Sequence, residues 1–449
     1  MKIALLAPAG AMYRYNRAFH RNLYYAPVTL ALLAAFVPEE LGAEVAIYDE
    51  TAEAIPLDIE ADIIGITCIT ATAKRCYKYA DYFRARGVTV VLGGVHPSLK
   101  PYEAMEHADS VVVGLGESNF RRMLLDYREG CIQKLYFQGE NASINDRPLP
   151  RKDLLNEKKY FTTNTVESLR GCNHSCSFCS YPAAFGSRLY KRSVIDIIGE
   201  IKEMEGRIVV FPDVNLIADK EFAKELLREM IPLKKCWFGH LTADVGEDDE
   251  LLKLLEKSGC KGLIINFETV NQKNETNIQE GINTVYEYAE LMDKLHSKGI
   301  IVMGSFDFGS DDDETDVFKR TVKLCKDIKL DLPLFFVMTP YPGTAYYRQL
   351  EKEGRIIERA WSMYDGEHAV YRPKNMSPGE LEYGMRWARK EVFSPAGILK
   401  RMDIKNLFNI IKMYSLFLAL NFEQMRNANI LEPLGRNIVT DDSDIPDCG

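Results

Sequence analysis

Short apolar runs alternate with helical segments in this 449-residue chain, and this alternation limits its fold more than any other feature. In residues 1–140 the strand-like runs are Lys2–Ala7, Glu44–Tyr48, Ile63–Thr67, Val88–Leu92 and Ser110–Val113. The helical segments are Thr29–Leu41, Ala73–Arg86 and Tyr102–His107. Such alternation predicts a parallel sheet with helices on both faces. We therefore expect an α/β protein whose N-terminal domain, residues 1–140, is doubly wound and Rossmann-like.

A second alternating region follows a polar segment. Residues 141–160, NASINDRPLPRKDLLNEKKY, contain two prolines and few apolar residues, which is typical of a linker. In residues 161–344 we expect six strands: Thr165–Leu169, Arg207–Phe211, Cys236–Leu241, Gly262–Asn266, Ile300–Ser305 and Leu332–Val337. A complete βα barrel has eight such units, so this region predicts a partial (β/α)6 barrel.

Residues 345–449 lack a convincing strand pattern and predict a helical C-terminal domain. The expected helices are Pro378–Val392 and Ile398–Asn427. The second helix carries an apolar stripe at helical spacing, formed by Leu407, Ile410, Ile411, Tyr414 and Leu418. We expect these helices to cap the barrel mouth, and the acidic tail, TDDSDIPDCG, to be loose.

Composition excludes several classes of protein. Hydrophobic residues make up 46% of the chain and charged residues 27%, which is an ordinary globular mixture. The net charge of -9 argues against binding to nucleic-acid phosphates. The N-terminus lacks a signal-peptide pattern, and no apolar stretch reaches the roughly 18 residues of a membrane span. We therefore expect a cytoplasmic, monomeric protein without nucleic-acid or membrane partners.

Three of the ten cysteines lie within eight residues, in Arg170-Gly-Cys172-Asn-His-Ser-Cys176-Ser-Phe-Cys179. Thiolates are soft ligands that bind iron–sulfur clusters, zinc or copper(I). A loop with this spacing can hold one cuboid cluster and leave one iron open for chemistry. The alternative is zinc with His174 as the fourth ligand, although structural zinc sites usually pair two separated knuckles. A redox disulfide would not need three cysteines.

The cysteine spacing, the aromatic residue before the third cysteine and the position after a predicted barrel strand resemble the radical S-adenosylmethionine (SAM) superfamily. The resemblance implies a 4Fe–4S cluster on Cys172, Cys176 and Cys179, with SAM chelated at the open iron. One electron from an external flavodoxin or ferredoxin type of donor would cleave SAM to methionine and a 5′-deoxyadenosyl radical.

The same resemblance implies SAM-binding residues on the barrel. The candidates are Phe178, Tyr181, Arg192, Asp213 and Glu268. Phe178 would pack near the adenine, and the guanidinium of Arg192 would suit the SAM carboxylate. The alternatives are a solvated helix start for Arg192 and a barrel-rim charge for Glu268. The turn Thr339-Pro-Tyr-Pro-Gly-Thr344 matches the cobalamin-associated subgroup of the superfamily.

The N-terminal domain resembles the cobalamin-binding domain that precedes many radical SAM barrels. Small and hydroxylated residues at its strand ends would line the slot for the cobalamin tail: Thr67, Thr70, Thr72, Gly93, Gly94, His96, Gly114, Gly116 and Glu117. The family's cobalt-ligating motif, Asp-x-His-x-x-Gly, is missing, and His20 is the only histidine in the loop concerned. Aromatic residues of that loop could cover a corrin face: Tyr13, Tyr15, Phe19, Tyr24 and Tyr25. The alternative is a domain that only packs on the barrel.

The resemblance implies a cobalamin-dependent methyltransferase that acts on an unactivated carbon of a small-molecule or natural-product intermediate. One SAM would supply the methyl group through cobalamin, and a second would supply the radical. Related enzymes also cyclise or rearrange substrates, and a member without cobalamin could transfer another SAM-derived group. A non-enzyme alternative is an iron–sulfur sensor or scaffold. RNA modification would require a basic RNA-binding module, which the sequence lacks.

Overall fold

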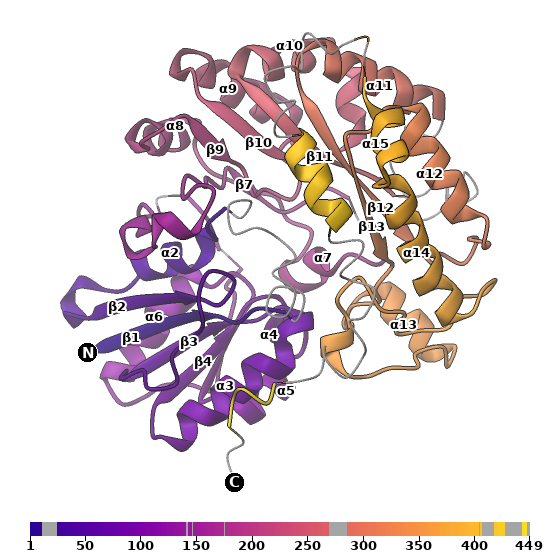
Figure 1. Cartoon of the computed structure of the whole chain (residues 1–449). Helices are drawn as coiled ribbons and strands as arrows, with labels where there is room; N and C mark the ends of the chain where they lie inside the picture. The colour runs from indigo at the N-terminus through magenta and orange to yellow at the C-terminus, as the bar shows by residue number, and fades with distance from the viewer. Residues whose placement is uncertain are drawn as a thin grey trace.

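The computed structural model describes residues 1–10, 25–140, 142–145, 147–174, 176–268, 285–403, 405, 417–426 and 442–446. Figure 1 shows two sheets, one in the N-terminal third of the chain and one in the middle, with the C-terminal helices against the second sheet. Several predicted features lie outside the described residues: His20, the aromatic cover at Tyr13, Tyr15, Phe19 and Tyr24, and the stripe residues Leu407, Ile410, Ile411 and Tyr414.

The N-terminal sheet has six parallel strands in the order β2-β1-β3-β4-β5-β6. They are β1 (Lys2–Ala7), β2 (Glu44–Asp49), β3 (Ile63–Thr67), β4 (Thr89–Gly93), β5 (Ser110–Val113) and β6 (Leu135–Phe137). The helices are α2 (Val28–Ala35), α3 (Ala73–Ala85), α4 (Val95–Leu99), α5 (Pro101–His107) and α6 (Glu117–Arg128). The predicted doubly wound fold is confirmed, with β6 as an additional edge strand.

Both faces of this sheet are buried, as parallel strands with helices on each side require. Alternate residues of β1 and β3 pack on opposite sides. One face contacts α3 through Cys76, Ala80 and Phe83. The other contacts α2 and α6 through Leu30, Ala34, Phe120, Met123 and Leu124. Because the strands are all parallel, their carboxyl ends lie at one common edge of the sheet. Thr67, Gly93 and Val113 meet the following loops there.

The second sheet has five parallel strands in the order β13-β12-β11-β10-β9. They are β9 (Ile208–Val210), β10 (Cys236–Leu241), β11 (Cys260–Glu268), β12 (Ile301–Phe308) and β13 (Leu332–Val337). The outer helices are α8 (Val194–Glu203), α9 (Lys220–Met230), α10 (Asp249–Ser258), α11 (Val285–Ser297) and α12 (Val317–Asp327). This is the partial barrel that the sequence predicts.

The first of the six predicted barrel strands, Thr165–Leu169, is wrong in its extent. Thr165 forms only an isolated parallel bridge with Val210 at the β9 edge. Beyond it the chain turns away, because the amide of Ser168 donates to the carboxylate of Asp213 at 3.0 Å. The next two residues form β7 (Leu169–Arg170), which pairs antiparallel with β8 (Tyr190–Lys191). A single bridge at Thr165 thus stands in place of the first predicted barrel strand.

The C-terminal helices are α13 (Ala345–Lys352), α14 (Pro378–Val392) and α15 (Pro395–Arg401). Helix α14 has the predicted bounds and begins with a capping box between Ser377 and Glu380. It packs on β13 and α12 and shares the apolar core of the barrel, so it covers the side of the barrel rather than its mouth (Figure 1).

The predicted helix Ile398–Asn427 is interrupted. Helix α15 ends at Arg401, because Met402 has an extended backbone and the carboxylate of Asp403 binds His296 at 2.8 Å. Helical structure is present again at residues 417–426. Within the described ranges, no helix has both the length and the apolar character needed to span a membrane.

The predicted loose tail is wrong for its described part, residues 442–446. Ile445 is 1% exposed and packs in the apolar cluster of the N-terminal domain. Arg75 of α3 binds Asp442 at 3.2 Å and Asp444 at 2.6 Å. Residues 442–446 therefore lie beside α3 and α5 in Figure 1, where the buried Arg75 binds two of their acidic side chains.

Candidate active site between the two domains

The three clustered cysteines lie on the loop between β7 and α7 (Ser180–Phe185). All three thiols are of intermediate exposure. Gly171 has a φ of +118°, and a Cβ there would lie 2.5 Å from the carbonyl oxygen of Arg188, so only glycine fits. The amide of Tyr346 donates to the carbonyl of Ser177 at 3.0 Å. The loop is therefore held at its start and near its middle.

The donor set of this loop fits an iron–sulfur cluster. Across the described ranges, no three His, Cys, Asp or Glu side chains are close enough to bind a single metal ion. A cuboid cluster holds its thiolate ligands further apart than one ion does. Three partly exposed thiols on one loop match a cluster that keeps one iron open.

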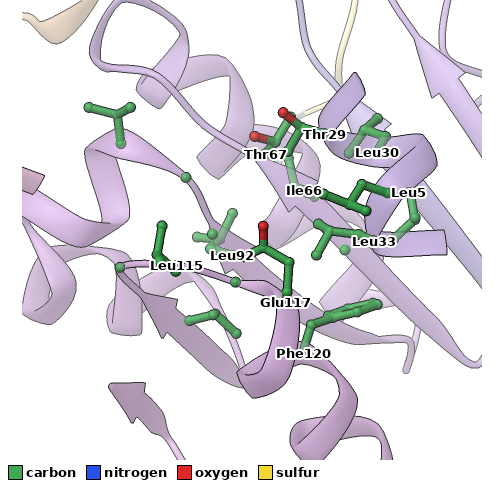
Figure 2. A pocket seen from close by; sticks show the side chains of 18 of the residues that line it. Leu5, Thr29, Leu30, Leu33, Ile66, Thr67, Leu92, Leu115, Glu117 and Phe120 are labelled. Atoms are coloured by element: carbon green, nitrogen blue, oxygen red, sulfur yellow. The ribbon is translucent and has the colours of Figure 1, made fainter. Parts of the chain in front are cut away.

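A cavity of about 310 Å³ lies at the carboxyl edge of the N-terminal sheet (Figure 2). Six of the predicted cobalamin contacts line it: Thr67, Gly93, Gly94, Gly114, Gly116 and Glu117. Leucines and isoleucines of β1, α2, β3 and β4 form much of the remaining wall. An apolar cavity with a few polar groups at strand ends is typical of a ligand site in a parallel sheet.

Four of the five glycines that line the cavity act in two ways. Gly94 and Gly114 have φ angles of +103° and +82°, and a Cβ would lie 2.8 Å from Cys68 O and 2.6 Å from Gln138 Oε1. Those two positions therefore require glycine for the backbone itself. At Gly93 and Gly116 the nearest atom to an added Cβ is 3.8 Å and 3.6 Å away. These two glycines instead leave room for a ligand.

Three predicted cobalamin contacts, Thr70, Thr72 and His96, do not line the cavity. All are buried, and His96 is 0% exposed. Its Nδ1 lies 3.3 Å from Thr70 Oγ1 and its Nε2 lies 3.4 Å from Glu103 Oε1. Residues 70–72 form a short 3-10 helix after β3, which directs their side chains into the domain instead of toward the cavity.

Residues of the barrel complete the cavity wall. Glu167, Arg170, Tyr181 and Phe185 line it from the barrel side. Tyr181, predicted to contact SAM, therefore lies with the predicted cobalamin contacts, where burial raises its pKa. Its ring centroid is 4.9 Å from that of Phe185. Phe178 packs against the barrel core. The cavity thus lies between the two domains.

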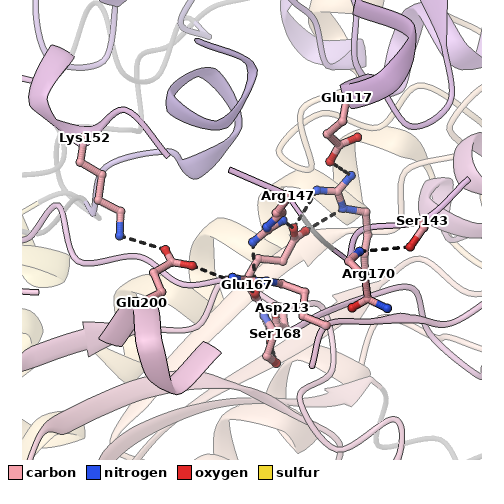
Figure 3. Close-up of polar contacts among 11 residues, drawn as sticks. Glu117, Ser143, Arg147, Lys152, Glu167, Ser168, Arg170, Glu200 and Asp213 are labelled. Atoms are coloured by element: carbon pink, nitrogen blue, oxygen red, sulfur yellow. Dashed lines mark hydrogen bonds and ion pairs between the residues drawn. The ribbon is translucent and has the colours of Figure 1, made fainter. Parts of the chain in front are cut away.

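A chain of buried charges runs from this cavity into the barrel (Figure 3). Arg170 binds Glu117 at 2.6 Å and holds both carboxylate oxygens of Glu167 at 2.7 Å. Arg147 binds the same Glu167. Burial acts to raise the pKa of Glu167, but the guanidiniums of Arg170 and Arg147 outweigh it and lower the pKa to about 2. Glu167 therefore stays ionised.

The sequence did not predict roles for Arg147, Glu167 or Arg170. Arg170 stands two residues before the first cysteine, and that proximity was the only local signal. Arg147 belongs to the predicted linker, yet its side chain is 2% exposed. A single arginine in a polar segment gives no pattern that would predict burial.

The remaining predicted SAM contacts have other partners. Arg192 is 4% exposed, and its Nη1 lies 2.7 Å from Glu200 Oε2, so it is neither solvated nor directed at an open site. Asp213 accepts hydrogen bonds from the amide and the hydroxyl of Ser168. Burial raises the pKa of Asp213 to about 7. Glu268 ends β11, but its side chain lies outside the described part of the structure.

Two titratable side chains face the inside of the barrel. Their strand neighbours Leu241, Phe306 and Phe308 are buried in the outer core, so His240 and Asp307 point to the opposite side. Burial lowers the pKa of His240 to about 4 and raises that of Asp307 to about 6. Burial thus favours the neutral form of both groups on the inner side of the barrel.

Comparison with known proteins agrees with both halves of the site. Residues 166–328 match the family model of the radical SAM superfamily, and residues 19–124 match that of the B12 binding domain. A bacteriochlorophyllide d C-12(1)-methyltransferase of Chlorobaculum tepidum is 28% identical over 393 residues, which cover 85% of each chain. The C-8(2)-methyltransferase of that organism is 26% identical over 418 residues, covering 88% of this chain and 91% of its own.

A solved structure has the same fold. It is the radical S-adenosylmethionine methyltransferase TsrM from Kitasatospora setae, with cobalamin and a [4Fe-4S] cluster bound. The TM-score is 0.65 at 17% sequence identity, and the match covers 96% of this chain and 99% of the other. The arrangement of N-terminal sheet, partial barrel and C-terminal helices is therefore shared.

Proposed function

This chain belongs to the radical SAM enzymes that carry a cobalamin-binding domain, and we propose that it transfers a methyl group to an unactivated carbon of a small-molecule substrate. Its cofactors are a 4Fe–4S cluster, SAM and cobalamin. When bound, the cluster supplies the electron for reductive cleavage of SAM, and cobalamin carries the methyl group.

One observation carries this proposal. The cavity at the N-terminal sheet is closed by Glu167 and Arg170, which directly precede the cysteine loop. Cys172, Cys176 and Cys179 would hold the cluster, while Thr67, the cavity glycines and Glu117 would border cobalamin. Held by these residues, both cofactors would border the space between the domains, where one substrate carbon would be within reach of both.

The barrel interior supports a substrate of mixed character. Its inward side chains include the apolar Ile264, Met303 and Phe336 as well as the two titratable groups His240 and Asp307. The similar Chlorobaculum tepidum proteins are named for methylation of bacteriochlorophyllides. We propose a natural-product intermediate as substrate, and a flavodoxin- or ferredoxin-type protein of the cytoplasm as electron donor to a monomeric enzyme.

Anaerobic reconstitution with iron, sulfide and hydroxocobalamin tests the proposal. After desalting, the protein is expected to contain about four irons and one cobalt and to convert SAM to 5′-deoxyadenosine under reduction. Cys176→Ala is expected to lose the iron and this conversion. Cys131→Ala, which removes an exposed thiol outside the cysteine loop, is the matched control and keeps both.

The metal counts separate the alternatives. A full iron content without cobalt would retain the radical SAM chemistry but overturn cobalamin-dependent methyl transfer. Zinc in place of iron would overturn both.

A further inference from the structure

We infer that the ion pair between Glu117 and Arg170 couples cobalamin binding to assembly of the cluster loop. The inference rests on the proposed function, because it requires both cofactors. Both are positioning residues: Glu117 acts through α6, and Arg170 acts through β7.

The first step of the argument is where the two residues lie. Glu117 is the first residue of α6, and its carboxylate lines the cavity just after Gly116 (Figure 2). Arg170 ends β7 and is separated by one residue, Gly171, from the first cysteine ligand. The Glu117–Arg170 ion pair therefore connects the wall of the cobalamin cavity to the loop that would hold the cluster.

The second step is how firmly that contact is held. The Nη1 of Arg170 lies 2.6 Å from Glu117 Oε1, with side-chain exposures of 16% and 8%. The other edge of the guanidinium is bound by both oxygens of Glu167. Arg147 fixes Glu167 in turn, with Nη2 3.2 Å from its carbonyl oxygen (Figure 3). A guanidinium bound at two edges cannot reorient without leaving a buried charge unpaired.

The third step is the consequence for binding. A cluster fixes Cys172, and with it Arg170 and the carboxylate that borders the cavity. Cobalamin then meets a wall whose position the loaded loop has set, so the free energy of binding differs between cluster-loaded and cluster-free protein. Because linkage is reciprocal, cobalamin stabilises the loaded cysteine loop by the same factor.

The experiment compares the dissociation constant of hydroxocobalamin, measured by equilibrium dialysis, for cluster-loaded and cluster-free protein. Wild-type protein is expected to bind at least about five-fold more tightly when the cluster is present. In Glu117→Gln, which keeps the shape but removes the charge, this ratio is expected to fall to about one. Glu367→Gln is the matched control, since Glu367 holds Arg389 in a buried two-point pair of 2.6 and 2.9 Å elsewhere in the chain.

Two results would overturn the inference while leaving the proposed function intact: equal affinities in wild-type protein, or an unchanged ratio in Glu117→Gln. Absence of hydroxocobalamin binding in every form would instead overturn the proposed function. Should Glu117→Gln lack the wild-type circular dichroism spectrum, Glu117→Asp provides the same comparison, because it keeps the charge and shortens its reach toward Arg170.

Discussion

The indole nitrogen of Trp361 donates a hydrogen bond of 2.7 Å to Glu103 Oε1, which joins the C-terminal part of the chain to the N-terminal domain. The same oxygen accepts from the hydroxyl of Tyr77 at 3.2 Å. Burial acts to raise the pKa of Glu103, but His96, Trp361 and Tyr77 together lower it. The N-terminal domain is therefore connected to the C-terminal region by this contact and to the barrel by the Glu117–Arg170 pair.

Replacing Trp361 with Phe should loosen the domain contact. The change removes the donor and leaves a partly buried carboxylate with fewer partners, which costs about 1.5–3 kcal/mol. We expect a lower melting temperature by calorimetry. Tyr102→Phe, at a side chain 73% exposed on the same helix as Glu103, should leave the melting temperature unchanged. Equal melting temperatures for all three proteins would refute the structural role of this contact.

Adjacent glycines of the cavity should respond differently to a methyl group. Gly93→Ala meets no atom nearer than 3.8 Å, so we expect wild-type stability but at least ten-fold weaker hydroxocobalamin binding, roughly 1.4 kcal/mol. Gly94→Ala would force a left-handed φ of +103° and a 2.8 Å approach to Cys68 O. It should destabilise the domain by at least about 1–2 kcal/mol. Unaltered binding by Gly93→Ala would show that cobalamin does not occupy the cavity.

Stability should depend on pH through His296. Its ring nitrogens lie 2.8 Å from Asp403 and 2.9 Å from Asp331, and its side chain is 1% exposed. Burial acts to lower the pKa of His296, but the two carboxylates outweigh it and raise the pKa to about 10. Between the ordinary value of about 6.5 and pH 10 the folded protein holds the extra proton. Its stabilising effect is complete below pH 6.5 and is lost as pH rises through 10.

His296→Gln should remove this pH dependence and cost about 3–5 kcal/mol near pH 6, because two buried carboxylates lose their cation. Thermal melts between pH 6 and pH 10 measure both effects. His107→Gln is the control, since its pair with Asp81 is exposed by 29% and 40% and should contribute little. A wild-type slope retained in His296→Gln would contradict the assignment.

The C-terminal segment should stabilise the N-terminal domain. Ile445→Ala removes a side chain that is 1% exposed, and such truncations cost about 2–5 kcal/mol. Pro446→Ala, at the exposed neighbour, should change the free energy of unfolding by less than about 0.5 kcal/mol. Urea unfolding measures the free energy of unfolding of each variant, and hydrogen exchange measures the protection of α3. Similar effects of the two changes would place the segment outside the folded core.

Much of the fold could be predicted because the signals are local. The runs Lys2–Ala7, Cys236–Leu241 and Leu332–Val337 are strands with the predicted bounds, since each is a short, mostly apolar run of strand length. Helix α14 has its predicted bounds because Ser377, Pro378 and Glu380 encode its start. The segment Thr165–Leu169 is also predicted as a strand, yet beyond its bridge with Val210 the amide of Ser168 donates to the carboxylate of Asp213, a partner 45 residues away in the sequence.

The site residues also divide into those with a local sequence signal and those brought together only by the fold. By itself the sequence determined the three-cysteine loop and the glycine-rich strand ends, because both features depend only on residues that are neighbours in the chain. Only the tertiary structure decided that Thr67 faces the cavity while His96 does not, and that Glu117 meets Arg170 beside Glu167 and Arg147. The physical reason is that buried charges select partners by proximity in space, and the packing of the two domains creates that proximity.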